Sequence, residues 1–466
     1  MKIVILFALI SLFLYLGNKK PVWGFWIALS LFFNPAGLIS YYMPNPIIGP
    51  LLLSDLMFFC MIFCFYKSKT NGKLWKSYDK QYKTFFYYLC FLLIYYYVVV
   101  LWLVPLYFER FDIHNFIKGR KFIWGILIGL MVYKEILWYG FQTLFKVVIW
   151  TTIIGISLFF ISMLGYSIVP IIEVQRYAGE SLLRYGMLSY GIMTMILYLV
   201  WTIILMNSDF IKKSKNSIYY YIAFALYILV GLLTLTRRTY LNFFLLPVLL
   251  YFLYSYIVKK TISLYKIIVP FFFIVIILGV FSPAFFITAE RIVKDTFLLV
   301  FTGKDTRGEG NYRLEGEGDL LLTKKFIRES PILGQGYYYF NYGLKYDNTV
   351  SVKDMNFMNA QDAAFEVPIY SVFFQRGWLG FLLYIPVYIF IILILQKIII
   401  ILRKNIRYLA RDIPLCVVFA ISMVLFFVQV FSINAYNLFG TFTEPMFMIY
   451  CALLFATHRI IKDYVR

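Results

Sequence analysis

Apolar segments long enough to cross a lipid bilayer recur from one end of the chain to the other. A membrane-spanning helix needs about 20 mostly apolar residues, and short polar stretches separate segments of this kind. The pattern predicts about twelve or thirteen spanning helices, because Asn34-Pro35 interrupts the early segments. The predicted spans are 2–17, 22–40, 49–66, 84–106, 117–137, 141–164, 183–206, 217–236, 239–258, 264–287, 378–402, 412–433 and 443–462.

One long polar segment, residues 288–362, interrupts this series. It divides the chain into a predicted N-terminal membrane bundle (1–287), a large loop (288–362) and C-terminal membrane helices (363–466). Within the loop, the pattern from Asp319 to Glu329 predicts an amphipathic helix that lies along the membrane surface. Ser330-Pro331 is expected to end this helix, and Gly334-Gln335-Gly336 to make a tight turn.

Composition narrows the class further. Apolar residues make up 62% of the chain and charged residues 14%, which excludes a soluble enzyme, a disordered chain and a disulfide scaffold. The predicted fold is therefore an all-α polytopic membrane protein with one large loop. The five cysteines lie in apolar runs and are interpreted as small core residues. With two histidines in the whole chain, no metal site and no cofactor is expected.

The net charge of +21 is interpreted as the positive charge of cytoplasmic loops in a membrane protein rather than as a sign of nucleic-acid binding. Lysine and arginine concentrate in alternate short loops, such as 67–83 and 397–411, and cytoplasmic loops of membrane proteins carry such an excess. This pattern places the C-terminus in the cytoplasm and the 288–362 loop on the extracytoplasmic side.

Several arginines fall on the predicted outer side, where the positive-inside pattern disfavours them. Arg237 and Arg238 occupy the tight connection between two spans, Thr234 to Tyr240. They could snorkel to the outer surface, or they could point into a polar cavity and bind an anion. Because arginine pairs bidentately with phosphate, a converging group of arginines suits a diphosphate. The candidate diphosphate-binding residues are Arg176, Arg184, Arg237, Arg238 and Arg313.

Acidic residues near the end of the loop are candidates for proton transfer. Asp362 and Glu366 are four residues apart, so a helix would place them on one face. Either carboxylate could take a proton from an attacking sugar hydroxyl, or could be merely exposed or paired. Asp55 lies near the outer end of its predicted span, where it is expected to pair with an arginine in a structural or a functional role.

Three stretches together resemble the O-antigen ligase/O-antigen polymerase superfamily of bacterial membrane glycosyltransferases. The first is Thr236-Arg237-Arg238 at the start of a span. The second is Arg313 followed by Pro331-Ile332-Leu333-Gly334-Gln335-Gly336, which resembles the family's Arg…Pro-x-x-Gly-x-Gly run in its large loop. The third is Gly377-Trp378-Leu379-Gly380, which resembles the Gly-x-x-Gly that opens the next span. Arg176-Tyr177-Ala178-Gly179 loosely matches an earlier Arg-x-x-Gly.

The chain departs from that pattern at one place. Ligases of the family, and many polymerases, carry a His-Asn pair about eleven residues before the Gly-x-x-Gly, and here that place holds Glu366-Val367. This departure favours a polymerase over a ligase, with Glu366 or Asp362 in the histidine's role.

The resemblance implies a GT-C-like membrane glycosyltransferase in the cytoplasmic (inner) membrane of a bacterium. It would polymerise an O-antigen, capsule or other repeat-unit polysaccharide by metal-independent, inverting transfer from an undecaprenyl-diphosphate-linked oligosaccharide. Its implied partners are that lipid-linked donor, the lipid bilayer and a chain-length regulator. A ligase that moves finished glycan to a lipid or protein acceptor is one alternative. A transporter of lipid-linked oligosaccharide or of an anion, which would carry inverted repeats, is the other.

Overall fold

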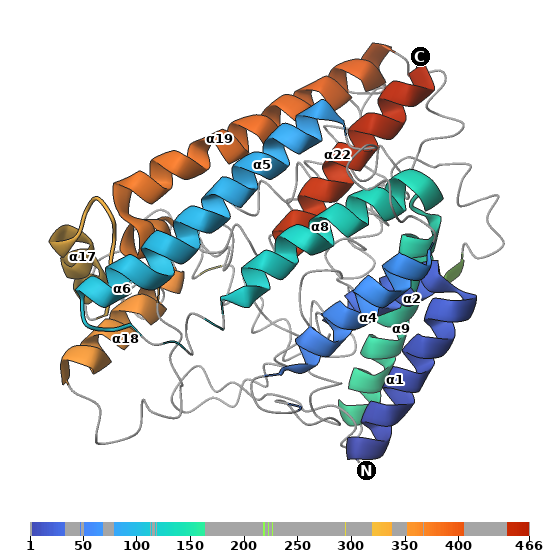
Figure 1. The fold of residues 1–466 in the computed structure, drawn as a ribbon, viewed down its shortest axis with the longest axis horizontal. Coiled ribbons are helices and arrows are strands. Elements are labelled where there is room, and N and C mark those ends of the chain that lie inside the picture. The colour runs from blue at the N-terminus through green and yellow to red at the C-terminus, as the bar shows by residue number, and fades with distance from the viewer. Residues whose placement is uncertain are drawn as a thin grey trace.

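The computed structural model describes residues 2–32, 47, 51–68, 79–111, 113, 117, 119–163, 218, 219, 222, 226, 294, 319–337, 352–366, 368–404 and 445–465. Over these residues the protein is an assembly of α-helices (Figure 1). The predicted spans 183–206, 239–258, 264–287 and 412–433, and nearly all of 217–236, lie outside the described residues.

The helices of the N-terminal part follow the predicted spans closely. They are α1 (Lys2–Lys19), α2 (Pro21–Phe32), α4 (Leu53–Lys67), α5 (Lys80–Tyr95), η2 (Tyr96–Leu103), α6 (Val104–Tyr107), α8 (Arg120–Tyr139) and α9 (Gln142–Met163). The helices of the C-terminal part are α17 (Asp319–Glu329), α18 (Val352–Glu366), α19 (Pro368–Lys404) and α22 (Pro445–Val465). The amphipathic helix predicted over Asp319–Glu329 is confirmed as α17. The predicted boundary between 362 and 363 falls inside α18.

Among the residues that the structure describes, two helical segments are long and apolar enough to cross a membrane. One runs through α5, η2 and α6 from Lys80 to Tyr107, and the other covers Tyr370–Ile401 of α19. The first has 28 residues, a length of about 42 Å against a bilayer core of about 30 Å. α19 starts ten residues before the predicted span 378–402, because a helical segment, 368–376, precedes a bend at Gly377.

Contacts between side chains show how the helices run relative to one another. Asp55 at the start of α4 meets Arg120 at the start of α8, and Ser68 just after α4 meets Glu135 near the end of α8, so these helices run in parallel. The hydroxyl of Tyr88 donates to the carbonyl of Leu383, and further along α5 Tyr95 contacts the carbonyl of Arg376. α5 and α19 are therefore antiparallel. These directions are the ones that the alternating-loop prediction requires.

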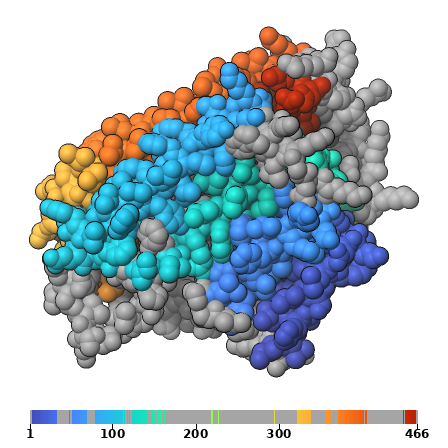
Figure 2. Space-filling view, viewed as in Figure 1, coloured from blue at the N-terminus to red at the C-terminus, as the bar shows by residue number. Residues whose placement is uncertain are grey.

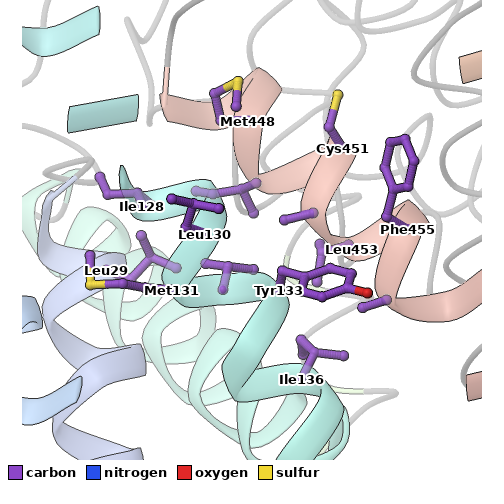
Figure 3. Packing of buried hydrophobic residues seen from close by; sticks show 14 of the residues in the cluster. Leu29, Ile128, Leu130, Met131, Tyr133, Ile136, Met448, Cys451, Leu453 and Phe455 are labelled. Atoms are coloured by element: carbon purple, nitrogen blue, oxygen red, sulfur yellow. The ribbon is translucent and has the colours of Figure 1, made fainter. Parts of the chain in front are cut away.

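A large apolar core joins α8, α22, α2 and α4. Figure 3 shows residues of this core from α2, α8 and α22. Leu453 and Phe455 of α22 are fully enclosed, and so are Ile128 and Tyr133 of α8. Tyr133 stacks on Tyr82 of α5, with ring centroids 4.1 Å apart, which ties the long helix to this core. Helix packing of this kind follows from the apolar patterning alone and requires no particular motif.

Candidate functional site

The site is built where α17, the bend of α19 and the far end of the long α5–η2–α6 helix meet (Figures 1 and 2). A bend in a helix leaves carbonyls unpaired at the end of one segment and N–H groups unpaired at the start of the next. In α19 the bend lies at Gly377, whose φ of 59° and ψ of −163° are adopted almost only by glycine.

The turn after α17 supplies the missing partners. The N–H groups of Gln335 and Gly336 donate to the carbonyls of Phe374 and Gln375, at 2.6 and 3.1 Å. The carbonyls of Pro331 and Ile332 in turn accept from the N–H groups of Trp378 and Leu379, at 2.8 and 3.0 Å. One short turn therefore caps both broken ends of α19, which removes the cost of unpaired backbone groups inside an apolar bundle.

The same turn is bonded to the long helix. The N–H of Val104 donates to the carbonyl of Val99, one residue further back than in an α-helix. Pro105 has no N–H, so neither residue can satisfy the carbonyl of Val100. That carbonyl accepts instead from the N–H of Tyr337 at 3.1 Å. We call this three-way contact between residues 331–337, 374–379 and 100–105 the joint.

Glycines make this close approach possible. Gly334 and Gly336 have φ values of 74° and 78°, as expected of the tight turn predicted there. A Cβ at Gly334 would lie 2.5 Å from the backbone N of Arg376, and one at Gly336 would lie 2.9 Å from the carbonyl oxygen of Val100. A Cβ at Gly377 would collide with the carbonyl of Ile332. The Pro-x-x-Gly-x-Gly and Gly-x-x-Gly stretches are thus complementary halves of one contact.

Two arginines lie at the joint. Arg376 is fully buried, and its guanidinium carbon lies 5.2 Å from the ring centre of Tyr96 and 4.5 Å from that of Tyr384. Arg110, in the connection after α6, donates to Oε1 of Gln335 at 3.4 Å and stacks on Phe357, 4.0 Å from the ring centre. Such cation–π contacts stabilise a guanidinium away from bulk water.

Sequence reasoning did not single out Arg110, Arg376 or Gln335 as site residues. Arg376 carried a signal, since it is a lone charge between two apolar stretches. Arg110 and Gln335 carried no such signal. Their importance comes from their contact with each other, and they lie more than 200 positions apart along the chain.

The predicted site residues are placed unevenly. Asp362 and Glu366 are both on α18, one helical turn apart, as predicted. The five predicted diphosphate-binding arginines, Arg176, Arg184, Arg237, Arg238 and Arg313, lie outside the described residues. Asp55 is buried and pairs with Arg120, whose nitrogen lies 2.6 Å from Oδ2, so the expected pairing with an arginine is confirmed. Among the described residues, no cluster of histidine, cysteine or acidic residues is arranged to hold a metal ion.

Neither a search of protein-family models nor a search of curated proteins finds a match to this chain. The function is therefore inferred from the residues and their geometry.

Proposed function

We propose that the protein is a bacterial cytoplasmic-membrane glycosyltransferase that polymerises a cell-surface polysaccharide. It would transfer glycan from undecaprenyl diphosphate to an acceptor sugar on a second lipid-linked repeat unit. About twelve or thirteen spans would form the membrane part, with the 288–362 segment on the extracytoplasmic side.

The observation that carries this proposal is the joint. The two stretches that resemble the family's loop motif and its span-opening motif are about 40 residues apart, and they cap one another through four backbone hydrogen bonds. A chance likeness of two short glycine motifs would not require them to be complementary. The joint also sits beside α18, which carries the two candidate carboxylates.

Exposed apolar surface supports a place in the membrane. Large apolar side chains on the long helix and on α19 face outward, among them Phe91, Ile94, Leu382, Ile389 and Ile392. Soluble proteins rarely expose large patches of apolar side chains, whereas lipid covers them in a membrane. Trp102 and Trp378 are exposed near one end of the two helices, and Lys80, Lys83, Arg403 and Lys404 lie near the other. Interfacial tryptophans at one end and cytoplasmic basic residues at the other are typical of spanning helices.

The chemistry we propose is a single inverting displacement. The acceptor hydroxyl oxygen attacks the anomeric carbon, while Glu366 or Asp362 takes the hydroxyl proton. The bond from that carbon to the diphosphate oxygen breaks, and the bonding electrons leave with undecaprenyl diphosphate. Arginines stabilise the negative charge that grows on the leaving diphosphate. The residues proposed for this role are Arg176, Arg184, Arg237, Arg238 and Arg313.

A reconstitution experiment tests the proposal. The purified protein in nanodiscs is given an undecaprenyl-diphosphate-linked oligosaccharide, and the products are separated on a gel. A ladder of multiples of the repeat unit is expected. Transfer that occurs only after a lipid or protein acceptor is added would identify a ligase instead. Unreacted donor in both assays, with several donors tried, would contradict both enzyme assignments.

A single substitution tests the diphosphate site. Arg237→Ala should abolish the ladder while the protein still inserts and folds, because the leaving group loses its counter-charge. Arg459→Ala is the matched control, since Arg459 is a partly exposed residue that pairs with Asp463 within α22. Full product from Arg237→Ala would contradict the assignment of Arg237.

The bend in α19 is a feature shared with transporters, which also contain broken helices. In a transporter, the broken ends face a substrate cavity near the middle of the membrane. In α19 the backbone groups of Phe374, Gln375, Trp378 and Leu379 are bonded to the protein's own turn. This arrangement supports a structural bend beside a catalytic loop, so we favour the transferase.

A further inference from the structure

The segment that carries the candidate carboxylates is a closed helical hairpin. Phe357 of α18 and Phe374 of α19 are 17 positions apart in sequence, yet their ring centres lie 5.3 Å apart. The chain between them must therefore double back, with α18 ending at Glu366 and α19 beginning at Pro368. We call residues 357–366 of α18 together with residues 368–374 of α19 the carboxylate hairpin. Glu366 lies at its tip and Asp362 midway along its first arm.

The base of the carboxylate hairpin is held by a small set of buried contacts. Phe326 of α17 completes a cluster with Phe357 and Phe374, at ring distances of 5.5 and 6.1 Å. The hydroxyl of Thr323 donates to the carbonyl of Ala360 at 2.7 Å. All of these side chains are buried, so the base is a packed unit.

Gln335 connects this base to the joint. Its side chain is 2% exposed, its Nε2 donates to the carbonyl of Phe326 at 2.8 Å, and its backbone N–H donates to the carbonyl of Phe374 at 2.6 Å. Its Oε1 accepts from Arg110 at 3.4 Å. Gln335 therefore contacts α17, α19 and the end of the long helix with three different groups.

Arg110 brings the outer end of the long helix against the same base. Its guanidinium stacks on Phe357 at 4.0 Å and also lies 5.9 Å from the ring centre of Phe326. A planar guanidinium can stack with its face and donate hydrogen bonds with its edge, which lysine cannot do. Glu109, the preceding residue, has a φ of 58°, unusual for a residue other than glycine, and this backbone turn directs the chain at Arg110.

We propose that Arg110 and Gln335 are positioning residues that fix the base of the carboxylate hairpin to the outer end of the long helix. This inference rests on the proposed function for what the hairpin does. The first arm, residues 357–366, is about 13 Å long, so a tilt of about 5° at the base displaces the tip by about 1 Å. A displacement of that size is enough to reduce the rate of a positioned reaction by about 100-fold.

Two measurements on the purified full-length protein in nanodiscs test this inference. The variants are Arg110→Met, Arg110→Lys, Gln335→Leu and Phe357→Leu, and the matched control is Arg328→Gln, an exposed arginine on α17. The first measurement is hydrogen–deuterium exchange over residues 352–366, which needs no substrate. The second is the steady-state rate of glycan transfer.

We expect amide exchange in α18 to rise about tenfold in Arg110→Met and in Phe357→Leu. A double variant that combines these two substitutions should show no faster exchange than either single variant, because both remove the same contact. We expect kcat to fall about 10- to 100-fold in these variants, with KM for the donor within about threefold of the parent. Lysine at position 110 should recover less than half of the lost rate, whereas a purely electrostatic role predicts full recovery. The Arg328→Gln control should match the parent protein in both measurements.

The outcomes separate this inference from the proposed function. Unchanged exchange in α18 would overturn the contact between Arg110 and the hairpin. Raised exchange with an unchanged kcat would overturn the positioning role. Raised exchange in the variants of a protein that turns over no glycan donor would contradict the proposed function, and would leave the connection between the long helix and α18 established.

Discussion

The joint and the apolar core of α8, α22, α2 and α4 are held together by different kinds of interaction. The core consists of enclosed side chains such as Ile128, Leu453 and Phe455, which are held by packing (Figure 3). The joint is held by backbone hydrogen bonds between segments that approach closely because its glycines have no Cβ. Packing depends on volume and tolerates exchange among apolar residues, whereas the joint depends on backbone shape at single positions. The core therefore tolerates substitutions among apolar residues, whereas the joint tolerates few substitutions at its glycines.

The largest effect is expected at Gly377. Gly377→Ala should lower the free energy of unfolding by about 3–4 kcal/mol, because it adds a collision with the carbonyl of Ile332 to an unfavourable φ. The measurement is thermal unfolding in detergent, followed with a thiol-reactive dye that detects exposure of the buried cysteines.

Gly140 offers a matched control for this substitution. It has nearly the same backbone geometry as Gly377, with φ 67° and ψ −168°, but no atom lies within 4 Å of a Cβ added there. Gly140→Ala should cost about 1–2 kcal/mol, the conformational part alone. Equal losses at the two glycines would show that the close approach in the joint contributes nothing.

The next largest effect is expected in the core. Leu453→Ala should cost about 2–4 kcal/mol, because it leaves a cavity at a fully buried site. Leu453→Met keeps the volume and should cost about 1 kcal/mol or less. The same unfolding assay measures both. If methionine were as damaging as alanine, the core would be as strict as the joint, and the comparison would fail.

A smaller effect is expected at the ion pair between α4 and α8. Asp55→Asn should cost about 2 kcal/mol, because Arg120 loses its carboxylate partner but keeps partial access to solvent. A double-mutant cycle with Arg120→Gln should return a coupling of about 1–2 kcal/mol. A coupling near zero would mean that Asp55 acts mainly through its other contact, the N–H of Leu52 at 2.7 Å.

The smallest effect on stability is expected at the ion pair between Arg459 and Asp463. Asp463→Asn removes an exposed pair with Arg459 on one face of α22, at 2.7 Å, and should cost about 0.3 kcal/mol. Raising the salt concentration should produce a shift of similar size in the parent protein. A loss above about 1 kcal/mol would indicate that this end of α22 is packed more tightly than its exposure suggests.

Much of the helical framework could be predicted from the sequence. The bounds of α9, α17 and α22 differ from the predicted ranges by three residues or fewer. The reason is local: apolar periodicity sets each helix, and Ser330-Pro331 and the tight turn after it set the end of α17. The pairing of Asp55 with an arginine was also predictable, because a buried carboxylate near a membrane interface requires a cation. Its partner, Arg120, was not.

The candidate site was predictable only in fragments. Asp362 and Glu366 could be placed on one helix face from their spacing, and the glycine motifs could be read as a turn and the start of a span. Nothing local indicates that the turn caps the bend, since every residue other than proline carries the same backbone N–H and carbonyl groups. The sequence by itself determined the bounds of α9, α17 and α22 to within three residues, because helix formation depends mainly on neighbours within a few positions. It did not determine the start of α19, which lies ten residues before the predicted span. The tertiary structure alone decided that the carbonyl of Val100, which Pro105 leaves unbonded, accepts from the N–H of Tyr337. It also decided that Arg110 reaches both Gln335 and Phe357. Those contacts join segments more than 200 residues apart.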